Sequence, residues 1–407
     1  MCKIIVKSAA DYLHPFYFVS TAIYRIIKLK GQPILKGKKM KTVNVHTMIL
    51  GLILGSLLAA GAASAHEAKA PMHDTAYELS GPFTHQNLSI YFVHSKEKST
   101  SGQEYITLQE ALEKGAVKIV ETGSVGNLTI INNAKNANIF IQSGDIVKGG
   151  RQDRTIKYDY IITPRHKELS LSSFCVEHGR WSKRGGEAGD KFSSSSDRLS
   201  SRELQMAAKY EGNQSRVWEE VGNAQTKLSR NIGKPVKSPE SESSLQLTLE
   251  NKDLNEFVDE YIEALAPAIK TKKYVVGIVA AINGRVVTAD IYESENLFAK
   301  LSDKLLRAAA VEAAAEYQKG KDFGIPSVCQ AQEFLSDENA CKERYEQVNS
   351  DTILRITETK DKVIFDTYFQ KTNSMPVHRN FIYSNEEERS SSRRHNLDQI
   401  QTEPARR

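Results

Sequence analysis

The sequence predicts an α+β fold with a mainly antiparallel sheet and helices packed on it. In the first half, short β-type runs follow one another with little helical pattern between them, which favours antiparallel pairing over βαβ crossovers. In the second half, Asn283-Gly284 separates two apolar runs, and this pair supplies the positive φ that a tight hairpin turn needs. Helical spacing of apolar residues surrounds that hairpin. The 407 residues can fill one large domain with appendages or two modest domains.

The first element in chain order is a segment with the features of a cleavable signal peptide, residues 40–65. Four lysines precede an apolar run at 48–58, and small residues lead to an Ala-x-Ala end at Ala65, as export and signal cleavage require. We expect cleavage after Ala65, Met40 as the true first residue, and residues 1–39 as an extension that does not belong to the protein. The product is then periplasmic or secreted. The alternative, a retained anchor, conflicts with a run shorter than the ~20 residues of a membrane span.

The mature chain begins with short strands. Gly, Asn and Pro separate apolar or β-branched runs, with one short helix among them at 107–114. The predicted strands are 88–94, 117–121, 128–132, 138–142, 157–163 and 169–177. A Gly-, Ser- and charge-rich stretch at 179–201 predicts a mobile surface loop.

The second half predicts helices around the hairpin. The expected helices contain the stripe Val217, Val221, Ala224 and Leu228, the apolar face of 254–265, and a segment capped by Ser294. We expect one domain over 79–324, a small appended segment over 325–384 and a disordered tail over 385–407, which is too polar to fold. The appended segment contains a polar, helical stretch at 329–350 and a small hairpin.

Charge and cysteine content restrict the partners. Lys and Arg number 55 against 50 Asp and Glu, a slight excess that gives little evidence for a nucleic-acid partner, and none is predicted. No other part of the sequence approaches a transmembrane span, so no membrane association is expected after leader removal. In an oxidising compartment, Cys329 and Cys341 are close enough in sequence for a local disulfide, which would contribute about 3 kcal/mol by the chain-entropy estimate. Cys175 would then be unpaired.

The first candidate site is the run Gly144 to Arg154. Its paired glycines turn backbone N–H groups outward while Lys148, Arg151 and Arg154 bring positive charge, an arrangement that suits phosphate or carboxylate. The alternative is a tight turn between strands in which Arg154 pairs with Asp145 or Asp153.

The second candidate site is Cys175 to Trp181, at the end of a predicted strand. Cys175 could act as a nucleophile or Glu177 as a general base. Strand alternation places Cys175 and Glu177 on one side and His178 on the other, which argues against a Cys–His couple. No metal site or cofactor is predicted. The alternative is structural: a buried Cys175, a Glu177–Arg180 ion pair, and Trp181 packed beneath the Arg180 guanidinium.

These two clusters, with SSRELQ, NQSRVWEEV and VGIVAAINGRVVTADIYESENLFAKLSDKLLRAAAVEA further on, resemble the ADP-ribosylglycohydrolase- and rhodanese-phosphatase-associated protein domain. Where the family usually has Gly-Ala-Lys-Gln-Asn-Arg, Gln152 and Arg154 match, while Arg151 and Asp153 replace Lys and Asn. The resemblance extends from about Leu79 to Gly324. By association it implies ADP-ribose or related phosphorylated compounds, and it carries no established activity.

The expected function is an exported ligand-binding or accessory module for a small anionic molecule. Arg151 and Arg154 would hold the anion, Gln152 would orient it, and the 179–201 loop would close over it. Lys148, Arg180 and Trp181 complete the predicted ligand set. Two alternatives remain open: a hydrolase or transferase that uses Glu177 or Cys175, and a structural envelope protein.

Overall fold

The computed structural model describes residues 77–96, 103–187, 189–270, 272–372, 375–385 and 387–390. The predicted leader, the first 39 residues and the tail beyond residue 390 lie outside these ranges, as does part of the start of the mature chain. Within them, no helix is both long and apolar enough to cross a membrane. The fold is α+β with mainly antiparallel sheets, as predicted.

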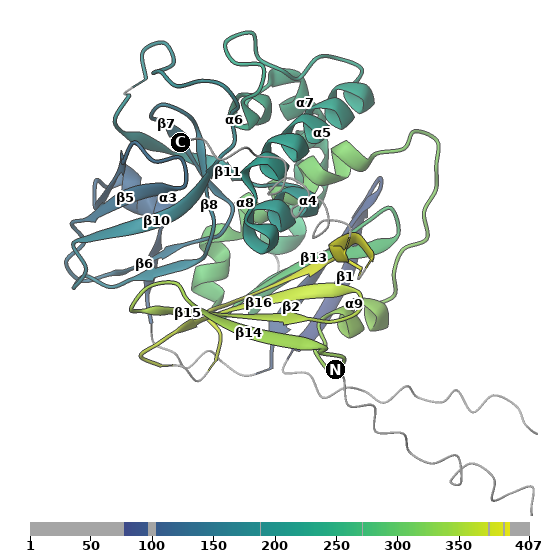
Figure 1. Cartoon of the computed structure of the whole chain (residues 1–407). Helices are drawn as coiled ribbons and strands as arrows, with labels where there is room; N and C mark the ends of the chain where they lie inside the picture. Colours follow the sequence, from purple (N-terminus) through teal and green to yellow (C-terminus); the bar gives the residue numbers. More distant parts are fainter. Residues whose placement is uncertain are drawn as a thin grey trace, which may run out of the picture. The chain divides into compact units, whose positions relative to one another are not determined.

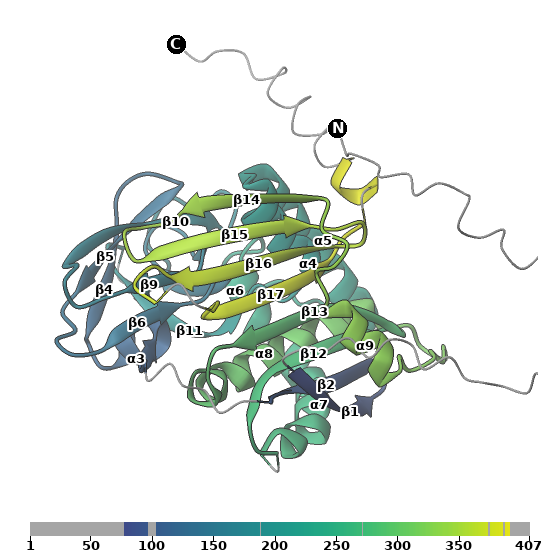
Figure 2. The ribbon, with the colours of Figure 1, turned by 90° about the horizontal axis from the view of Figure 1, so that it is seen from below.

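The largest element is an antiparallel eight-stranded sheet with the order β1-β2-β12-β13-β17-β16-β15-β14 (Figure 2). Its strands are β1 (Tyr77–His85), β2 (Leu88–Ser95), β12 (Val275–Ile282), β13 (Arg285–Tyr292), β14 (Lys342–Gln347), β15 (Thr352–Glu358), β16 (Lys362–Phe369) and β17 (His378–Tyr383). The predicted β12–β13 hairpin is confirmed: Ile282 pairs with Arg285, and both Asn283 and Gly284 have positive φ.

Two smaller sheets form the rest of the β structure (Figure 1). A six-stranded sheet contains β4 (Val117–Glu121), β5 (Asn127–Asn132), β7 (Asp145–Gly149), β8 (Arg154–Ile156), β10 (Glu168–Cys175) and β11 (Phe192–Arg198). A three-stranded sheet contains β3 (Tyr105–Thr107), β6 (Asn138–Ile141) and β9 (Tyr160–Ile162). The β3–β6 pair is parallel, and the other strand pairs of these two sheets are antiparallel.

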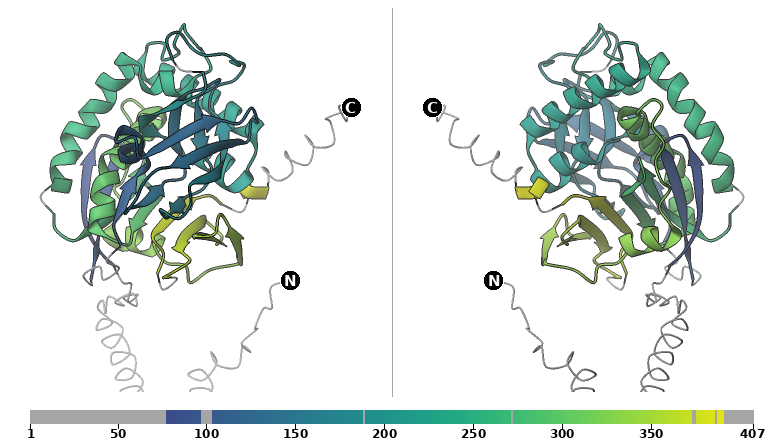
Figure 3. Two further views of the ribbon diagram at one scale, coloured as in Figure 1. Left: turned by 90° about the vertical axis from the view of Figure 1, so that its left-hand side faces the viewer. Right: turned by 90° about the vertical axis from the view of Figure 1, so that its right-hand side faces the viewer.

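Helices cover both faces of the eight-stranded sheet, because its central strands are apolar on both sides. Ile90 and Phe92 of β2 pack into the cluster that contains α7 (Lys252–Lys270) and α8 (Glu295–Glu316), which Figure 3 shows against the sheet. Tyr91 and Val93 face the other way, toward α9 (Val328–Phe334). The other helices of the described residues are α3 (Leu108–Glu113), α4 (Arg202–Gln205), the π-helix η3 (Met206–Glu211), α5 (Gln214–Ile232) and α6 (Leu245–Leu249). Ser294 caps α8 as predicted.

The predicted domain boundary at residue 324 is wrong. Strands β14 to β17 belong to the same sheet as β1 and β2, and β17 pairs directly with β13. The segment over 325–384 is therefore part of the domain, since the edge of β13 would otherwise be unpaired. Within it, the predicted polar helix at 329–350 is limited to α9, and the rest includes β14.

The predicted disulfide is not formed in the structure. Cys329 lies in the first turn of α9 and Cys341 lies just before β14; both thiols are free and exposed. Each cysteine is fixed by its own element. The backbone N–H of Cys341 donates to Glu358 of β15, and α9 packs on β1.

A buried polar group joins the sheets. Nδ1 of His378 lies 2.8 Å from Asp159, and its Nε2 lies 3.0 Å from Asp290 of β13. The imidazole also stacks on Tyr292, with ring centroids 4.5 Å apart. Burial lowers the pKa of His378, but the two carboxylates outweigh it and raise that pKa. Burial raises the pKa of Asp159, yet nearby Lys209 and His378 leave it well below its ordinary value.

Candidate functional site

The predicted glycine-rich turn connects β7 to β8. Gly149 and Gly150 both have positive φ, which side chains rarely tolerate. A Cβ on Gly150 would lie 2.3 Å from the ring of Phe192, the first residue of β11. The paired glycines are thus required by the turn and by its close approach to β11. That strand occupies part of the stretch predicted as a loop, and it pairs with β7 from Gly149 to Asp145.

Arg154 does not face a ligand. Its side chain is 1% exposed, and it donates to Glu121 over 3.0 Å and to Gln152 Oε1 over 3.0 Å. The prediction that Arg154 holds an anion is therefore contradicted, because its guanidinium is enclosed by protein groups. The alternative of a structural ion pair was correct in kind but named the wrong partners, Asp145 or Asp153.

Cys175 lies opposite Arg154 in the β8–β10 pairing and is buried. Its thiol donates to Gln152 Oε1 over 2.9 Å and contacts the Arg154 guanidinium. The amide of Gln152 also donates to the Glu177 carbonyl. Gln152 and Cys175 thus pack inside the fold, which contradicts the ligand-orienting role predicted for Gln152 and leaves the Cys175 thiol without access to solvent.

Behind the turn lies a buried carboxylate–guanidinium cluster, formed by Asp153, Glu177, Arg180 and Arg184. Arg180 Nε lies 2.7 Å from Glu177 Oε1, which confirms the predicted pair. Arg184 Nη1 lies 3.0 Å from Asp153 and 3.5 Å from Glu177. The hydroxyl of Ser244 also donates to Asp153 over 3.0 Å. The segment after β10, predicted to be mobile, is fixed by these bonds.

The two carboxyls of this cluster have pKa values shifted in opposite directions. Burial raises the pKa of Asp153, and the bond from Arg184 only partly offsets it. Burial also acts to raise the pKa of Glu177, but hydrogen bonds from Arg180 and Ser241 lower it overall. Such divergence is common in acid–base pairs, and it also occurs in structural ion-pair networks.

Three side chains next to this cluster are exposed: Arg151, Trp181 and Lys183, here called the exposed rim. Trp181 is 53% exposed, so it does not pack beneath Arg180 as the structural alternative predicted. Among the described residues, neither Arg151 nor Lys183 has a hydrogen-bond or ion-pair partner. Lys148 differs from them, because it pairs with Glu250 at 2.7 Å.

Comparison with known proteins places the chain in a family. Residues 76–381 match the family model ARPP-1, the ARG and Rhodanese-Phosphatase-superfamily-associated Protein domain. The chain belongs to this family. The ARPP-1 match continues past Gly324, where the resemblance was expected to end, because β14 to β17 complete the sheet of the domain. No curated protein and no solved structure matched.

The ARPP-1 domain also contains features that the sequence did not reveal. Some contacts come from segments that no local motif indicates. Arg184 and Ser244 contact the buried cluster, and Glu121 contacts Arg154. The sequence feature that pointed most strongly to the buried cluster was Asp153, because it lies inside the glycine-rich motif. In the described ranges, no three His, Cys, Asp or Glu side chains form a metal-ligand group.

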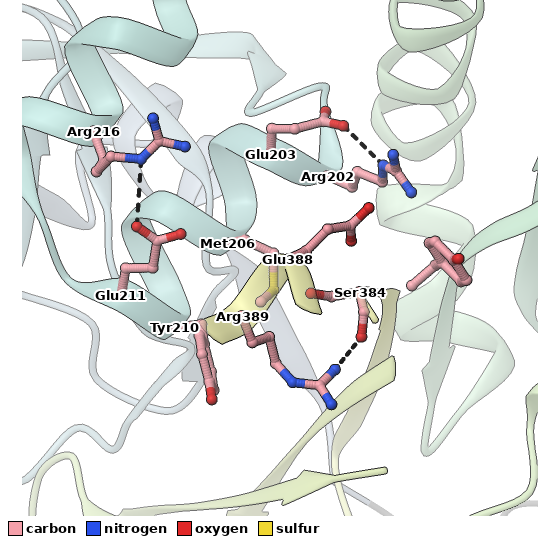
Figure 4. A pocket seen from close by; sticks show the side chains of 10 residues that line it. Arg202, Glu203, Met206, Tyr210, Glu211, Arg216, Ser384, Glu388 and Arg389 are labelled. Atoms are coloured by element: carbon pink, nitrogen blue, oxygen red, sulfur yellow. Dashed lines mark hydrogen bonds and ion pairs between the residues drawn. The ribbon is translucent and has the colours of Figure 1, made fainter. Parts of the chain in front are cut away.

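Two hollows of the ARPP-1 domain lie elsewhere. One, of about 220 Å³, is formed by the α4–η3–α5 segment and residues 383–389 (Figure 4). Its acids and bases are largely paired with one another, as Arg202 is with Glu203 and Arg216 with Glu211. The other, of about 580 Å³, lies among α3, β11, α7 and α8.

Proposed function

We propose that this protein is an exported ligand-binding or accessory module that holds a small anionic molecule with a planar ring at the exposed rim. The observation that carries the proposal is an exposed tryptophan next to two cations that have no partner among the described residues. A Trp face can stack on a flat ring, and a free guanidinium can bind phosphate or carboxylate with two hydrogen bonds. An ADP-ribose-like compound combines both features, in keeping with the family's association.

The buried cluster supports the proposal by making the rim rigid. Arg180 donates to the carbonyls of Gly149 and Gly150, over 3.4 Å and 3.2 Å. Arg151 directly follows Gly150 and Trp181 directly follows Arg180, so this contact brings their backbone positions close together. Preorganised groups of this kind lose little conformational entropy on binding. Arg151 and Trp181 remain from the ligand set predicted from sequence, whereas Arg154 and Gln152 do not.

Calorimetry with ADP-ribose, AMP, ribose 5-phosphate and sulfate tests the proposal. We expect ADP-ribose and AMP to bind more tightly than ribose 5-phosphate and sulfate, which lack a planar ring, and Arg151→Met to weaken the binding of ADP-ribose and AMP by about tenfold or more. Trp181→Ala should remove the preference for compounds with a planar ring. Lys118→Met, which removes another exposed cation, is the control. No binding at millimolar concentration, or binding that both rim variants leave unchanged, contradicts the proposal.

An enzyme that uses Glu177 as a general base is the second candidate, and the divergent pKa values of Asp153 and Glu177 favour it. Both carboxyls are enclosed, so the segment carrying Arg180 and Arg184 would have to move before a substrate reached them. Incubation with ADP-ribose conjugates, followed by product analysis, tests this candidate. Turnover that Glu177→Gln abolishes in a folded protein supports it, and the absence of any product counts against it.

Export is the remaining part of the proposal, and it rests on the sequence of residues 40–65. N-terminal sequencing of the native product should find His66 as its first residue, in the periplasmic or extracellular fraction. A cytosolic product that begins upstream of His66 contradicts export.

A further inference from the structure

We infer that the hollow among α3, β11, α7 and α8, here called the α8 groove, binds a small zwitterion the size of a dipeptide with apolar side chains. Its volume of about 580 Å³ is in the range of small-molecule sites. It contains none of the residues of the exposed rim, so this inference is independent of the proposed function.

One part of the α8 groove offers hydrogen-bond donors. Lys304 is 9% exposed and lies 3.0 Å from Asp145, which uses one of its three N–H bonds. Arg307 binds Asp197 through Nε and Asn255 through Nη2, and its Nη1 has no partner among the described residues. The acidic partners hold both cations in place, and each cation keeps N–H donors that a ligand carboxylate could accept from.

Another part offers acceptors. Asp303 is exposed and has no partner among the residues the structure describes. Glu113 accepts a hydrogen bond from Gln109 through Oε1 only, which leaves its second oxygen available. By contrast, Glu110 is already paired with Lys300, at 3.1 Å. Asp303 and Glu113 are therefore the two carboxylates available to a ligand ammonium.

Charge balance selects a zwitterion over a simple ion. Lys300, Lys304 and Arg307 each have an acidic partner, so the groove carries no surplus positive charge to attract an anion. A simple cation would satisfy Asp303 but leave the free donors of Lys304 and Arg307 without an acceptor. A molecule that carries both an ammonium and a carboxylate can bind Asp303 through the ammonium and Lys304 and Arg307 through the carboxylate.

The dimensions and the apolar wall set the size and class. Asp303 and Arg307 are one helical turn apart on α8, about 6 Å along the axis, and an extended dipeptide spans about 7 Å. Three apolar residues, Ile262, Ala266 and Leu306, also line the groove. An apolar side chain of the ligand would pack there.

Calorimetry with leucyl-leucine tests the inference, with two capped forms as comparisons. N-acetylleucyl-leucine lacks the ammonium, and leucyl-leucinamide lacks the carboxylate. We expect leucyl-leucine to bind and each capped form to bind about tenfold more weakly or worse. Equal binding of capped and free forms, or no binding of leucyl-leucine at millimolar concentration, overturns the inference.

Asp303→Asn is the decisive variant, because Asp303 has no partner to lose within the part of the chain that the structure describes. It should weaken leucyl-leucine about tenfold and leave N-acetylleucyl-leucine unchanged, whereas Asp259→Asn, an exposed change on α7, should alter neither. Unchanged binding of leucyl-leucine to Asp303→Asn overturns the inference. Arg151→Met should not affect this binding, so failure here and failure of the exposed rim are distinguishable.

Discussion

Arg154 Nη2 lies 3.0 Å from Glu121 Oε1, and both side chains are almost completely enclosed. This buried ion pair connects β8 to β4. Arg154, which the sequence alone assigned to ligand binding, is therefore part of the fold. The consequences for stability and for ligand binding can be separated by experiment.

Arg154→Met should destabilise the protein strongly, because it leaves Glu121 buried without its cation. Removing one partner of a buried pair costs about 3–5 kcal/mol. Urea unfolding monitored by circular dichroism measures the loss. Arg151→Met is the matched control in the same turn, and its exposed side chain predicts a change within roughly 0.5 kcal/mol. An Arg154→Met protein of normal stability that no longer binds an anion would restore the ligand role.

Cys175 should resist thiol reagents in the folded protein. Its side chain is buried against Gln152 and Arg154, whereas Cys329 and Cys341 are exposed. In a Cys329→Ser, Cys341→Ser variant, we expect an aromatic disulfide reagent to react with Cys175 only after denaturant is added. Rapid labelling of the native variant would refute the buried assignment and would revive the nucleophile hypothesis.

The Asp159–His378–Asp290 group should make stability depend on pH on both sides of neutrality. The pKa of His378 is raised from 6.5, so its contribution is complete below pH 6.5 and is lost as pH rises through the folded-state value. The pKa values of both aspartates lie below 3.8. Their contribution to the free energy of unfolding is therefore complete above pH 3.8 and is lost at lower pH.

His378→Gln tests this dependence. The difference in unfolding free energy between wild type and variant should be largest from pH 3.8 to pH 6.5 and should shrink at alkaline pH. Urea titrations across that range measure it. The exposed His178, replaced by Gln, is the control. A difference that grows with rising pH contradicts the assignment.

Glu312→Gln should stabilise the protein at neutral pH. Burial and neighbouring Glu203 raise the pKa of Glu312 to about 8, so the wild type loses stability as pH rises from 4.5 toward 8. Glutamine carries no charge and retains the carbonyl that accepts from the Arg202 N–H. We expect a gain of about 3 kcal/mol at pH 7 and almost none at pH 4.5.

Glu316→Gln is the control for that prediction. Glu316 lies one turn further along α8 and pairs with Lys227 at 2.5 Å. Its replacement should give no such gain at neutral pH. A destabilised Glu312→Gln protein at pH 7 would indicate that the native carboxyl is ionised and paired.

The elements that the sequence predicted correctly are those with strong local signals. Asn283-Gly284 fixes its hairpin because both residues need positive φ, and Ser294 begins α8 because its hydroxyl caps the first turn. The run 192–198 was missed as a strand, because four consecutive serines have little strand propensity. Its pairing with β7 decides its conformation.

The candidate site was predictable only in part. The Glu177–Arg180 pair follows from their spacing, and it is present. The partners of Arg154 and Asp153 were not predictable, because Glu121 and Ser244 lie far away in sequence and reach them only through the sheet and α6. A motif identifies its residues but does not show whether they face solvent or the interior.

The β13–β17 pairing sets an order for assembly. During synthesis the ribosome delivers β13 well before β17, so an apolar central strand keeps one open edge until nearly the whole domain has emerged. Such an edge is a template for pairing with other chains. A nascent chain of this protein therefore depends on its last strands for solubility as well as for stability. A holdase chaperone that binds the open edge of β13 would prevent such pairing.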